Sequence, residues 1–291
     1  MLEGMSASHA GRDARAVAGV QVTAGIAGAL AGGCRPVAVP LARHVARRLV
    51  ATALLGLASI AVSPSVNYVT AFPIVEMPIS EGNRWLNGRA YGADWNDVST
   101  TPGLAFGTQP GTGRFDDSVA VLRGSWGPDQ SLTAIVHAVT PKGGGVYEEV
   151  ELLLRWSLSP HSAKGYEINF RALNSSESYA EIVRWNGPKG NFTYLVQRRG
   201  LAYGIKDGDI VAATVEGILI TSYINGVAVA WARDSTYAAG SPGIGFYLQG
   251  ASGVNRDYGF TSFSASATGT LPLASPAGGC PRLSVRGWSS P

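Results

Sequence analysis

The chain has 291 residues, of which 45% are hydrophobic, 15% are charged and 38 are glycine. A single domain of about 200 residues with tails is the simplest organisation for this length, and frequent glycine turns with few charges favour short strands over helices. Six arginines before residue 62 account for the formal net charge of +3, because the remaining chain holds 17 Lys+Arg against 18 Asp+Glu. The composition therefore excludes a strongly basic, nucleic-acid-binding domain.

Residues 45–62 have the layout of a secretory signal peptide. Arg47 and Arg48 precede an apolar run that ends with small residues at Ser59 and Ala61, and the run is shorter than the roughly 20 residues that span a membrane. We expect a secreted or periplasmic protein of bacterial type, with no transmembrane span in the mature form, and we interpret residues 1–44 as a non-native or disordered extension. An uncleaved anchor, a buried helix and a lipoprotein signal ending at Cys34 are the alternatives.

The mature chain begins with a proline-broken lead-in over residues 63–84 and ends in a flexible Pro/Gly-rich tail over residues 266–291, which carries Cys280. One cysteine supports neither a disulfide framework nor a zinc site.

Between these segments, residues 85–265 alternate strand-like runs with turn signals. The expected strands are Ser118–Leu122, Leu132–Thr140, Tyr147–Leu158, Tyr166–Leu173, Tyr179–Trp185, Phe192–Gln197, Ile210–Val215, Ile218–Ile224, Val227–Arg233, Gly243–Leu248 and Tyr258–Ala265. Asn225-Gly226 supplies the two positive φ angles of a type I′ hairpin. Eleven strands without crossover helices predict an all-β fold, an antiparallel β-sandwich.

The C-terminal half carries a recognisable order of motifs. A Gly-Asp turn at Gly208-Asp209 leads to the Asn225-Gly226 hairpin, to Pro242-Gly243-Ile244-Gly245-Phe246 and to a closing strand at 257–263. This order resembles the concanavalin A-like lectin/glucanase jelly rolls, including laminin-G-like modules. The resemblance covers roughly residues 85–265, and it implies a jelly roll that recognises a glycan or polysaccharide on a concave sheet face.

The enzymes of this superfamily need motifs that the sequence does not complete. Glu149 and Glu151 lie on one strand face, as the E-x-D-x-x-E carboxylates of laminarinase-like glycosidases do, but the central Asp is missing. Gln197 is followed by arginines and not by the histidine expected in alginate-lyase-like enzymes. No G-x-S-x-G elbow, phosphate loop or H-E-x-x-H is present. We therefore favour a protein without catalytic residues.

Two pairs of aspartates could contribute ligands to calcium. Asp116 with Asp117, and Asp207 with Asp209, each supply two carboxylates, which is fewer than the 6–8 oxygens that calcium prefers. Aspartate is also common in turns, so we favour turns and expect no cofactor, with calcium as the alternative.

Three successive strands place polar side chains on one face. If they pair in chain order, their alternate positions form one patch of acidic, amide and guanidinium groups beside indole rings, a mixture suited to sugar hydroxyls and to the apolar face of a sugar ring. The candidate ligand-binding residues are Glu149, Glu151, Arg155, Glu167, Asn169, Arg171, Glu181 and Trp185. The alternative is a ladder of Glu–Arg pairs on a solvated sheet face.

The tryptophans are less informative. Trp231 alternates with apolar residues and is expected in the core, whereas Trp85, Trp95 and Trp126 could be binding platforms or plugs at the ends of the sandwich. The leading hypothesis is a lectin-like carbohydrate-binding protein. A jelly-roll polysaccharide lyase or glycoside hydrolase, and an envelope or extracellular module that contacts other proteins, are the alternatives.

Overall fold

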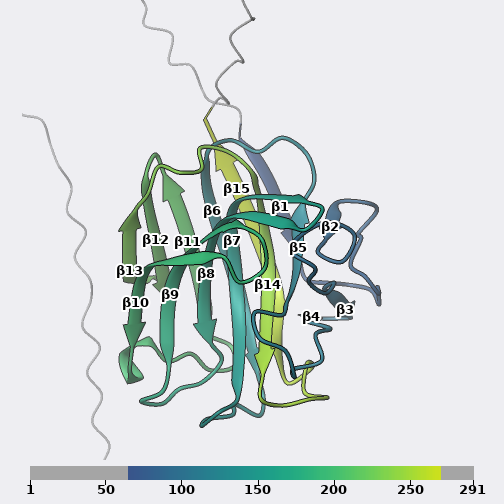
Figure 1. The fold of residues 1–291 in the computed structure, drawn as a ribbon, viewed down its shortest axis with the longest axis vertical. Helices are drawn as coiled ribbons and strands as arrows, with labels where there is room; N and C mark the ends of the chain where they lie inside the picture. Colours follow the sequence, from purple (N-terminus) through teal and green to yellow (C-terminus); the bar gives the residue numbers. More distant parts are fainter. Residues whose placement is uncertain (1–64, 270–291) are drawn as a thin grey trace, which may run out of the picture. The chain divides into compact units, whose positions relative to one another are not determined.

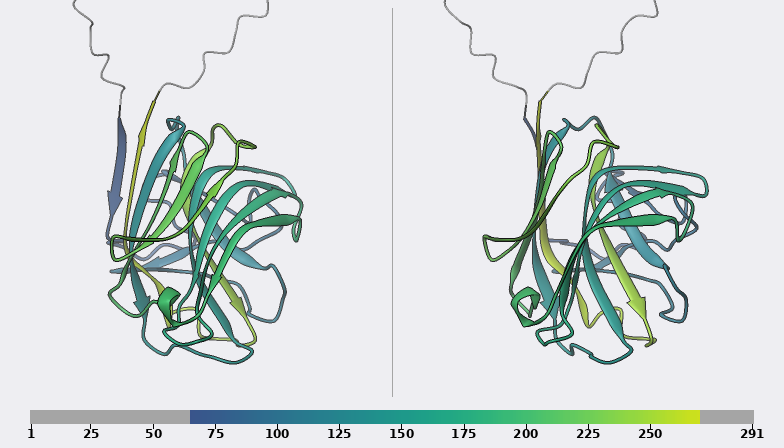
Figure 2. Two further views of the ribbon diagram at one scale, coloured as in Figure 1. Left: turned by 90° about the vertical axis from the view of Figure 1, so that its left-hand side faces the viewer. Right: turned by 60° about the vertical axis from the view of Figure 1, so that its left-hand side comes forward.

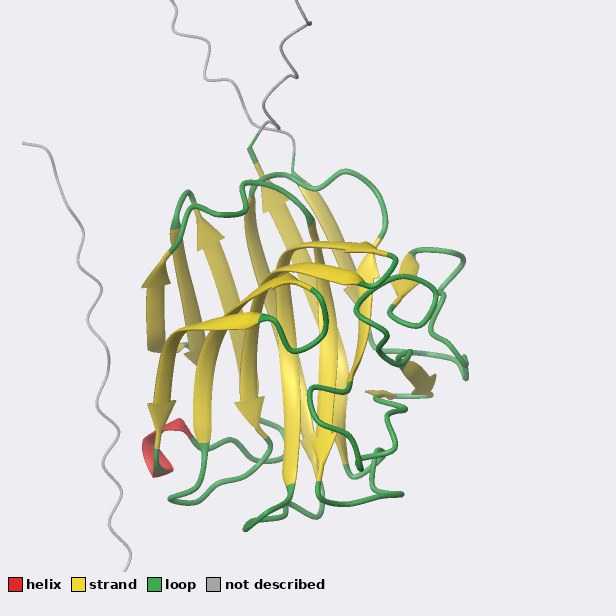
Figure 3. Ribbon diagram, in the orientation of Figure 1, coloured by secondary structure: helices red, strands yellow, loops and turns green. Residues whose placement is uncertain are grey.

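Fifteen strands and one short 3-10 helix make up residues 65–269, the part of the chain that the structure, a computed structural model, describes. All eleven expected strands are present, so the predicted fold class is confirmed (Figure 3). The strands are β1 Val66–Thr70, β2 Trp85–Asn87, β3 Ser99–Thr101, β4 Leu104–Phe106, β5 Asp117–Leu122, β6 Asp129–Ala138, β7 Tyr147–Ser159, β8 Ser162–Arg171, β9 Tyr179–Gly187, β10 Phe192–Arg199, β11 Ile210–Glu216, β12 Leu219–Ile224, β13 Val227–Arg233, β14 Ser241–Gln249 and β15 Tyr258–Thr268. The expected signal peptide, the extension before it, both cysteines and most of the C-terminal tail lie outside the described residues.

The strands form two antiparallel sheets that face each other (Figures 1 and 2). The first sheet has the order β13-β12-β11-β6-β15-β4-β3, with β1 also paired to β15. The second sheet has the order β10-β9-β8-β7-β14-β5-β2. Both sheets are antiparallel and the last strand returns beside the first, so the fold is an antiparallel β-sandwich.

Four strands of the N-terminal part were not among those predicted. β1 lies within the segment interpreted as a lead-in, yet it pairs with β15 from Val66 to Thr70, so the sandwich starts before Trp85. β2, β3 and β4 have three residues each, which is too short to show an alternating pattern. Within residues 65–269, no helix is long or apolar enough to cross a membrane.

The space between the sheets is filled by the inward-facing residues of both. On β8, Tyr166, Ile168 and Phe170 are completely buried, as the alternation predicts, while the residues between them point to the other face. Core residues from the second sheet meet those of the first, such as Phe260 and Phe263 on β15. Because alternate residues of a strand point to opposite faces, the residues between these core positions lie on the outer face of the second sheet.

The outer face of the second sheet carries a smaller apolar cluster of its own. Trp95, from the connection between β2 and β3, packs on Trp156 and Trp185 with ring centroids 5.7 and 4.7 Å away. Trp85, at the start of β2, and Trp126 are likewise buried, so these three tryptophans are packed in the interior and are not exposed platforms. Trp231 is 60% exposed, so the prediction that it lies in the core is wrong; a register shift between β12 and β13 next to Tyr223 turns it outward.

Candidate functional site

Beside the tryptophan cluster, the outer face of the second sheet holds a cavity of about 280 Å³. Strands β8, β9 and β10 curve around this side of the sheet (Figure 2). The charged and amide side chains that line the cavity are Arg114, Asp117, Glu149, Glu167, Asn169, Glu181, Arg199 and Gln249. Its size is near the lower end of the roughly 300–1,000 Å³ range of small-molecule sites, so it suits a compact ligand.

The pairing of β7, β8 and β9 brings the polar residues together. Glu151 is opposite Asn169 on β8, and Asn169 is opposite Glu181 on β9. Side chains that are directly opposite on one face are about 4.5–5.5 Å apart at Cβ, so these three form a row across the sheet. Of the eight candidate residues, Glu149, Glu167, Asn169, Glu181 and Trp185 line the cavity.

Each lining glutamate accepts hydrogen bonds from neighbouring side chains. Tyr179 donates its hydroxyl to Glu149. The indole nitrogen of Trp185 donates to Glu167 over 2.6 Å, and the amide of Asn169 donates to the other oxygen of Glu167 over 3.2 Å.

Glu181 is held at the edge of the sheet. Gln197 and Arg199 both donate to Glu181 Oε1, over 2.9 and 3.0 Å. Both donors come from β10, so this edge strand fixes the carboxyl from one side.

Other buried acceptors of the site have no partner among residues 65–269. Both carboxylate oxygens of Glu151, Oδ2 of Asp117 and Oδ1 of Asn169 are buried without a hydrogen bond. Glu151 is fully buried under the cavity, where Gly245 makes room for it, because a Cβ at that position would clash with the carboxylate. Buried polar groups normally have partners, so these acceptors distinguish the site from an ordinary sheet surface.

Burial raises the pKa of the acidic side chains of the cavity. Burial, followed by repulsion from other carboxylates, raises the pKa of Glu149 to about 8 even though Tyr179 donates to it. Burial likewise raises the pKa of Glu167 to about 7. For Asp117 and Glu151 the pKa is raised well above the ordinary value, again by burial first and then by neighbouring carboxylates. Several carboxyls of one cavity therefore titrate near physiological pH.

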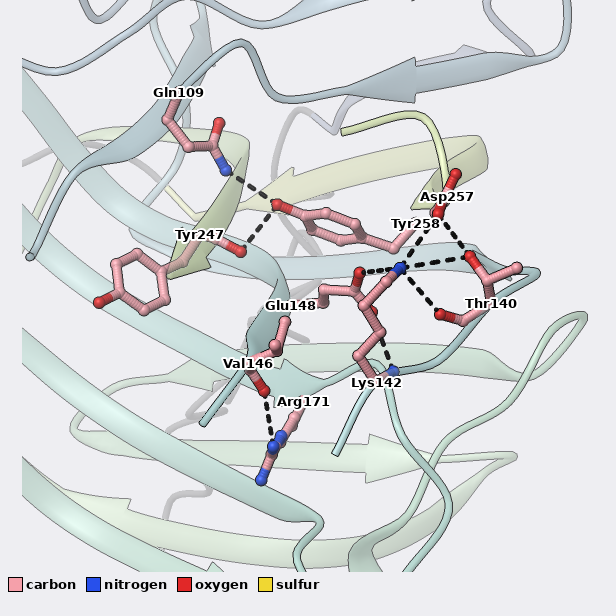
Figure 4. A network of polar contacts seen from close by, with 9 residues as sticks. All are labelled: Gln109, Thr140, Lys142, Val146, Glu148, Arg171, Tyr247, Asp257 and Tyr258. Atoms are coloured by element: carbon pink, nitrogen blue, oxygen red, sulfur yellow. Dashed lines mark hydrogen bonds and ion pairs between the residues drawn. The ribbon is translucent and has the colours of Figure 1, made fainter. Parts of the chain in front are cut away.

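Arg171, another candidate residue, supports the site from behind and does not line the cavity. Its guanidinium donates to the carbonyl of Val146 over 2.6 Å (Figure 4). It also donates to the carbonyls of Gly144 and Glu177, both over 3.1 Å, and lies over the Tyr147 ring. It is 3% exposed. The alternative of a solvated ladder is therefore wrong, because the glutamates and Arg171 are buried and this arginine binds a loop.

A separate contact network lies near Arg171 (Figure 4). Lys142 Nζ contacts Glu148 and Asp257 over 3.2 and 3.1 Å, and Tyr258 donates to the carbonyl of Tyr247 over 2.8 Å. These contacts join the loop before β7 to β14 and β15, below the cavity floor.

Arg155 is not part of the site. β7 has a register shift between Leu154 and Ser157, and Arg155 itself has a positive φ of 52°, so its side chain leaves the alternating pattern. Its guanidinium donates to the carbonyls of Pro128, Gly217 and Tyr237, over 2.7–2.8 Å. The expectation that it shares a face with Glu149 is wrong.

Of the aromatic wall of the cavity, sequence reasoning identified Trp185 as a site residue and missed the other rings. Trp185, Phe192 and Tyr194 follow one another with ring centroids 5.0 and 5.1 Å apart. Further aromatic residues in the lining are Tyr147, Tyr179 and Tyr247. Alternation on β10 could have identified Phe192 and Tyr194, but Tyr247 depends on the pairing of β14 with β7, which connects distant parts of the chain.

Asp117 was interpreted as a turn residue, but in the structure it lies in a strand. It begins β5, lies opposite Tyr247 and is 4% exposed. Asp209 does act in a turn, because its carboxylate accepts from the backbone of Lys206 over 2.9 Å. Within residues 65–269, no three His, Cys, Asp or Glu side chains are arranged to hold a metal ion.

Comparison with known proteins gives information about the fold alone. No protein-family model and no curated protein matches the sequence. The carbohydrate-binding module CBM66 from Bacillus subtilis aligns with 66% of this chain and 97% of its own, at 15% identity and a TM-score of 0.43. The carbohydrate recognition domain of Emp46p aligns with 68% of this chain and 95% of its own, at 10% identity and a TM-score of 0.44. An endo-β-galactosidase from Clostridium perfringens aligns with 71% of this chain and 62% of its own, at 9% identity and a TM-score of 0.42.

Proposed function

We propose that the chain is a carbohydrate-binding protein that holds a saccharide in the cavity on the outer face of the second sheet. The observation that carries this proposal is the combination, in one cavity, of buried acceptors that lack partners and a wall of aromatic rings. Sugar hydroxyls donate to such acceptors, and the apolar side of a sugar ring packs on an aromatic face. The signal-like segment at 45–62 supports an action outside the cytoplasm.

The test is a glycan and polysaccharide array probed with the full chain, with and without calcium. Binding to a defined glycan class is the expected result. Binding to none, by a protein that is folded by circular dichroism, would contradict the proposal and would favour the alternative of a module that contacts other proteins.

Tyr194 should contribute to binding more than to stability. It lines the cavity and is 47% exposed, so Tyr194→Ala removes ring contact with the ligand at little cost to the core. We expect affinity for the array's best ligand to fall roughly ten-fold, the scale of one aromatic contact. Titration calorimetry measures this change.

The matched control is Trp231→Ala, which removes an aromatic residue that is 60% exposed on the first sheet. It should leave the affinity unchanged. Equal losses in both variants would place the ligand somewhere other than this cavity.

A second candidate function is hydrolysis of a glycosidic bond. Burial raises the pKa of Glu149 to about 8, as a general acid requires, while Gln197 and Arg199 oppose the rise that burial causes in the pKa of Glu181 in the same cavity. If the protein is an enzyme, reducing ends appear during incubation with the bound glycan. Glu149→Gln, which keeps the shape but cannot release a proton, should then lower kcat by at least about 100-fold and leave binding nearly unchanged. Binding without product would restrict the function to recognition.

A further inference from the structure

We propose that the saccharide bound in this cavity is cationic: an amino sugar whose ammonium group enters the acidic cluster and displaces protons from it. This inference rests on the proposed function and specifies the class of saccharide. It follows from the charge of the site, from its unpartnered acceptors and from its aromatic walls.

The cavity has more carboxyl groups than cations to neutralise them. Asp117, Glu149, Glu167 and Glu181 line it, and repulsion from Glu149, Glu167 and Glu181 raises the pKa of at least one other carboxyl of the cavity in each case. Glu151 adds a fifth carboxyl directly beneath. A bound positive charge would relieve this repulsion.

The nearby arginines have contacts of their own: the exposed Arg114, which also lines the cavity, lies over the Phe115 ring. Arg171 is bound to three carbonyls and lies 3.3 Å from the carboxylate of Glu177. Arg199 pairs with Glu181 from the rim, where its side chain is 60% exposed. Without a ligand, protons neutralise the remaining acids.

Two unpartnered acceptors indicate what kind of group fits. Asp117 Oδ2 and Asn169 Oδ1 have no hydrogen bond within the described part of the chain, and both residues are at least nine-tenths buried and line the cavity. An ammonium group offers three donors and no acceptor, so it can serve both oxygens and a third carboxylate. Bonds between a charged donor and a carboxylate are about twice as strong as neutral ones.

The aromatic walls favour the same ligand. Trp185 lines the cavity next to the carboxyl groups, and aromatic faces attract a cation held within about 6 Å of the ring centre, whereas the Tyr147 and Tyr179 rings already have Arg171 and Arg199 over them. A uronic acid, in contrast, would bring a further negative charge to the cluster. An N-acetylated sugar lacks the positive charge. Its amide carbonyl is a hydrogen-bond acceptor, and it cannot donate to the unpartnered acceptors of the site as an ammonium group does.

Binding of such a ligand is coupled to protons. A positive charge next to Glu149 and Glu167 lowers the pKa of each below its value in the free protein, which is about 8 and about 7. At pH 7 the carboxyls of the bound state therefore hold fewer protons, and association with a ligand whose amine is already charged releases protons to the buffer. A neutral sugar produces no such release.

The experiment is titration calorimetry of the full chain at pH 7 in phosphate and in Tris, buffers with different heats of protonation. The two probes are a β-1,4-linked glucosamine oligosaccharide and its fully N-acetylated counterpart of equal length. We expect the amine to bind roughly ten-fold more tightly or better. Its heat of binding should differ between the buffers by an amount that corresponds to proton release.

Asp117→Asn tests the role of the cluster, and Asp116→Asn is its matched control, because Asp116 pairs with Lys189 and does not line the cavity. The first variant should reduce the preference for the amine, and the second should leave it intact. Equal or tighter binding of the N-acetylated probe, without proton release, overturns the inference while the proposed function stands. Failure of both probes, and of every glycan on the array, overturns the two together.

Discussion

Replacement of Arg155 by methionine is expected to lower the free energy of unfolding by about 3–5 kcal/mol, because it leaves buried carbonyls without their donor. The guanidinium bonds Pro128, which precedes β6, and Gly217, which follows β11, so it connects the second sheet to the first. It also lies 3.6 Å from Asp129, and its side chain is 3% exposed. Typical domains have only about 5–15 kcal/mol of stability, so this loss is a large part of the total.

Urea unfolding followed by tryptophan fluorescence measures this effect, and the control is Arg198→Met on the exposed face of β10. The control should change stability by less than about 0.5 kcal/mol. Arg155→Lys keeps the charge but cannot reach three carbonyls, so it should fall between the other two. A fully stable Arg155→Met protein that no longer binds its glycan would restore Arg155 to the site and contradict its structural role.

Arg155 also shows where the alternating pattern stops being informative. The period of two predicts faces correctly as long as a strand is regular. On β7 it holds for Glu149, Glu151 and Leu153, and it fails at the register shift that follows Leu154. A bulge changes the face of later residues by one position, and nothing in the local sequence marks this one.

The candidate site could be predicted where it is built by strands that are neighbours in the chain. β7, β8 and β9 pair in order, so the sharing of one cavity by Glu149, Asn169 and Glu181 follows from alternation. Asp117 and Tyr247 reach the same cavity only because β14 pairs with β7 and β5 pairs with β14. Pairings between strands that are distant in the chain are tertiary contacts, and they cannot be predicted from the residue pattern of a single sequence.

Burial of the polar face of the second sheet could not be predicted from the sequence either. Alternation separates the two faces of a strand, but it does not say what covers the second face. Here the connection that carries Trp95 packs on that face, and the curvature of β8 to β10 encloses the rest (Figure 2). The expectation of a solvated ladder failed for this reason, and the same enclosure produces the raised pKa values.

The stability of the unliganded protein is expected to decrease as the pH rises from 5 to 8, by on the order of 3 kcal/mol. Glu149 has a pKa of about 8 and Glu167 of about 7 in the folded protein, against an ordinary value of 4.5. Between these limits the folded protein binds more protons than the unfolded chain, so stability is present at low pH and is lost as the pH rises through the folded values. Asp234 has a lowered pKa and gives the opposite trend at acid pH, since stability is lost as its carboxylate is protonated.

Urea unfolding at intervals from pH 4 to pH 9 measures this dependence, and Glu151→Gln identifies its source. Glu151 is fully buried and its oxygens have no partner among residues 65–269, so the neutral amide copies the protonated acid without its ionisation. The variant should match the wild type at pH 5 and exceed it in stability at pH 8. Glu216→Gln, at an exposed position of β11, should follow the wild type throughout. Stability that stays constant or rises from pH 5 to pH 8 would mean that the acids of the cavity are ionised in the folded protein, and it would remove the protons that an ammonium group is expected to displace.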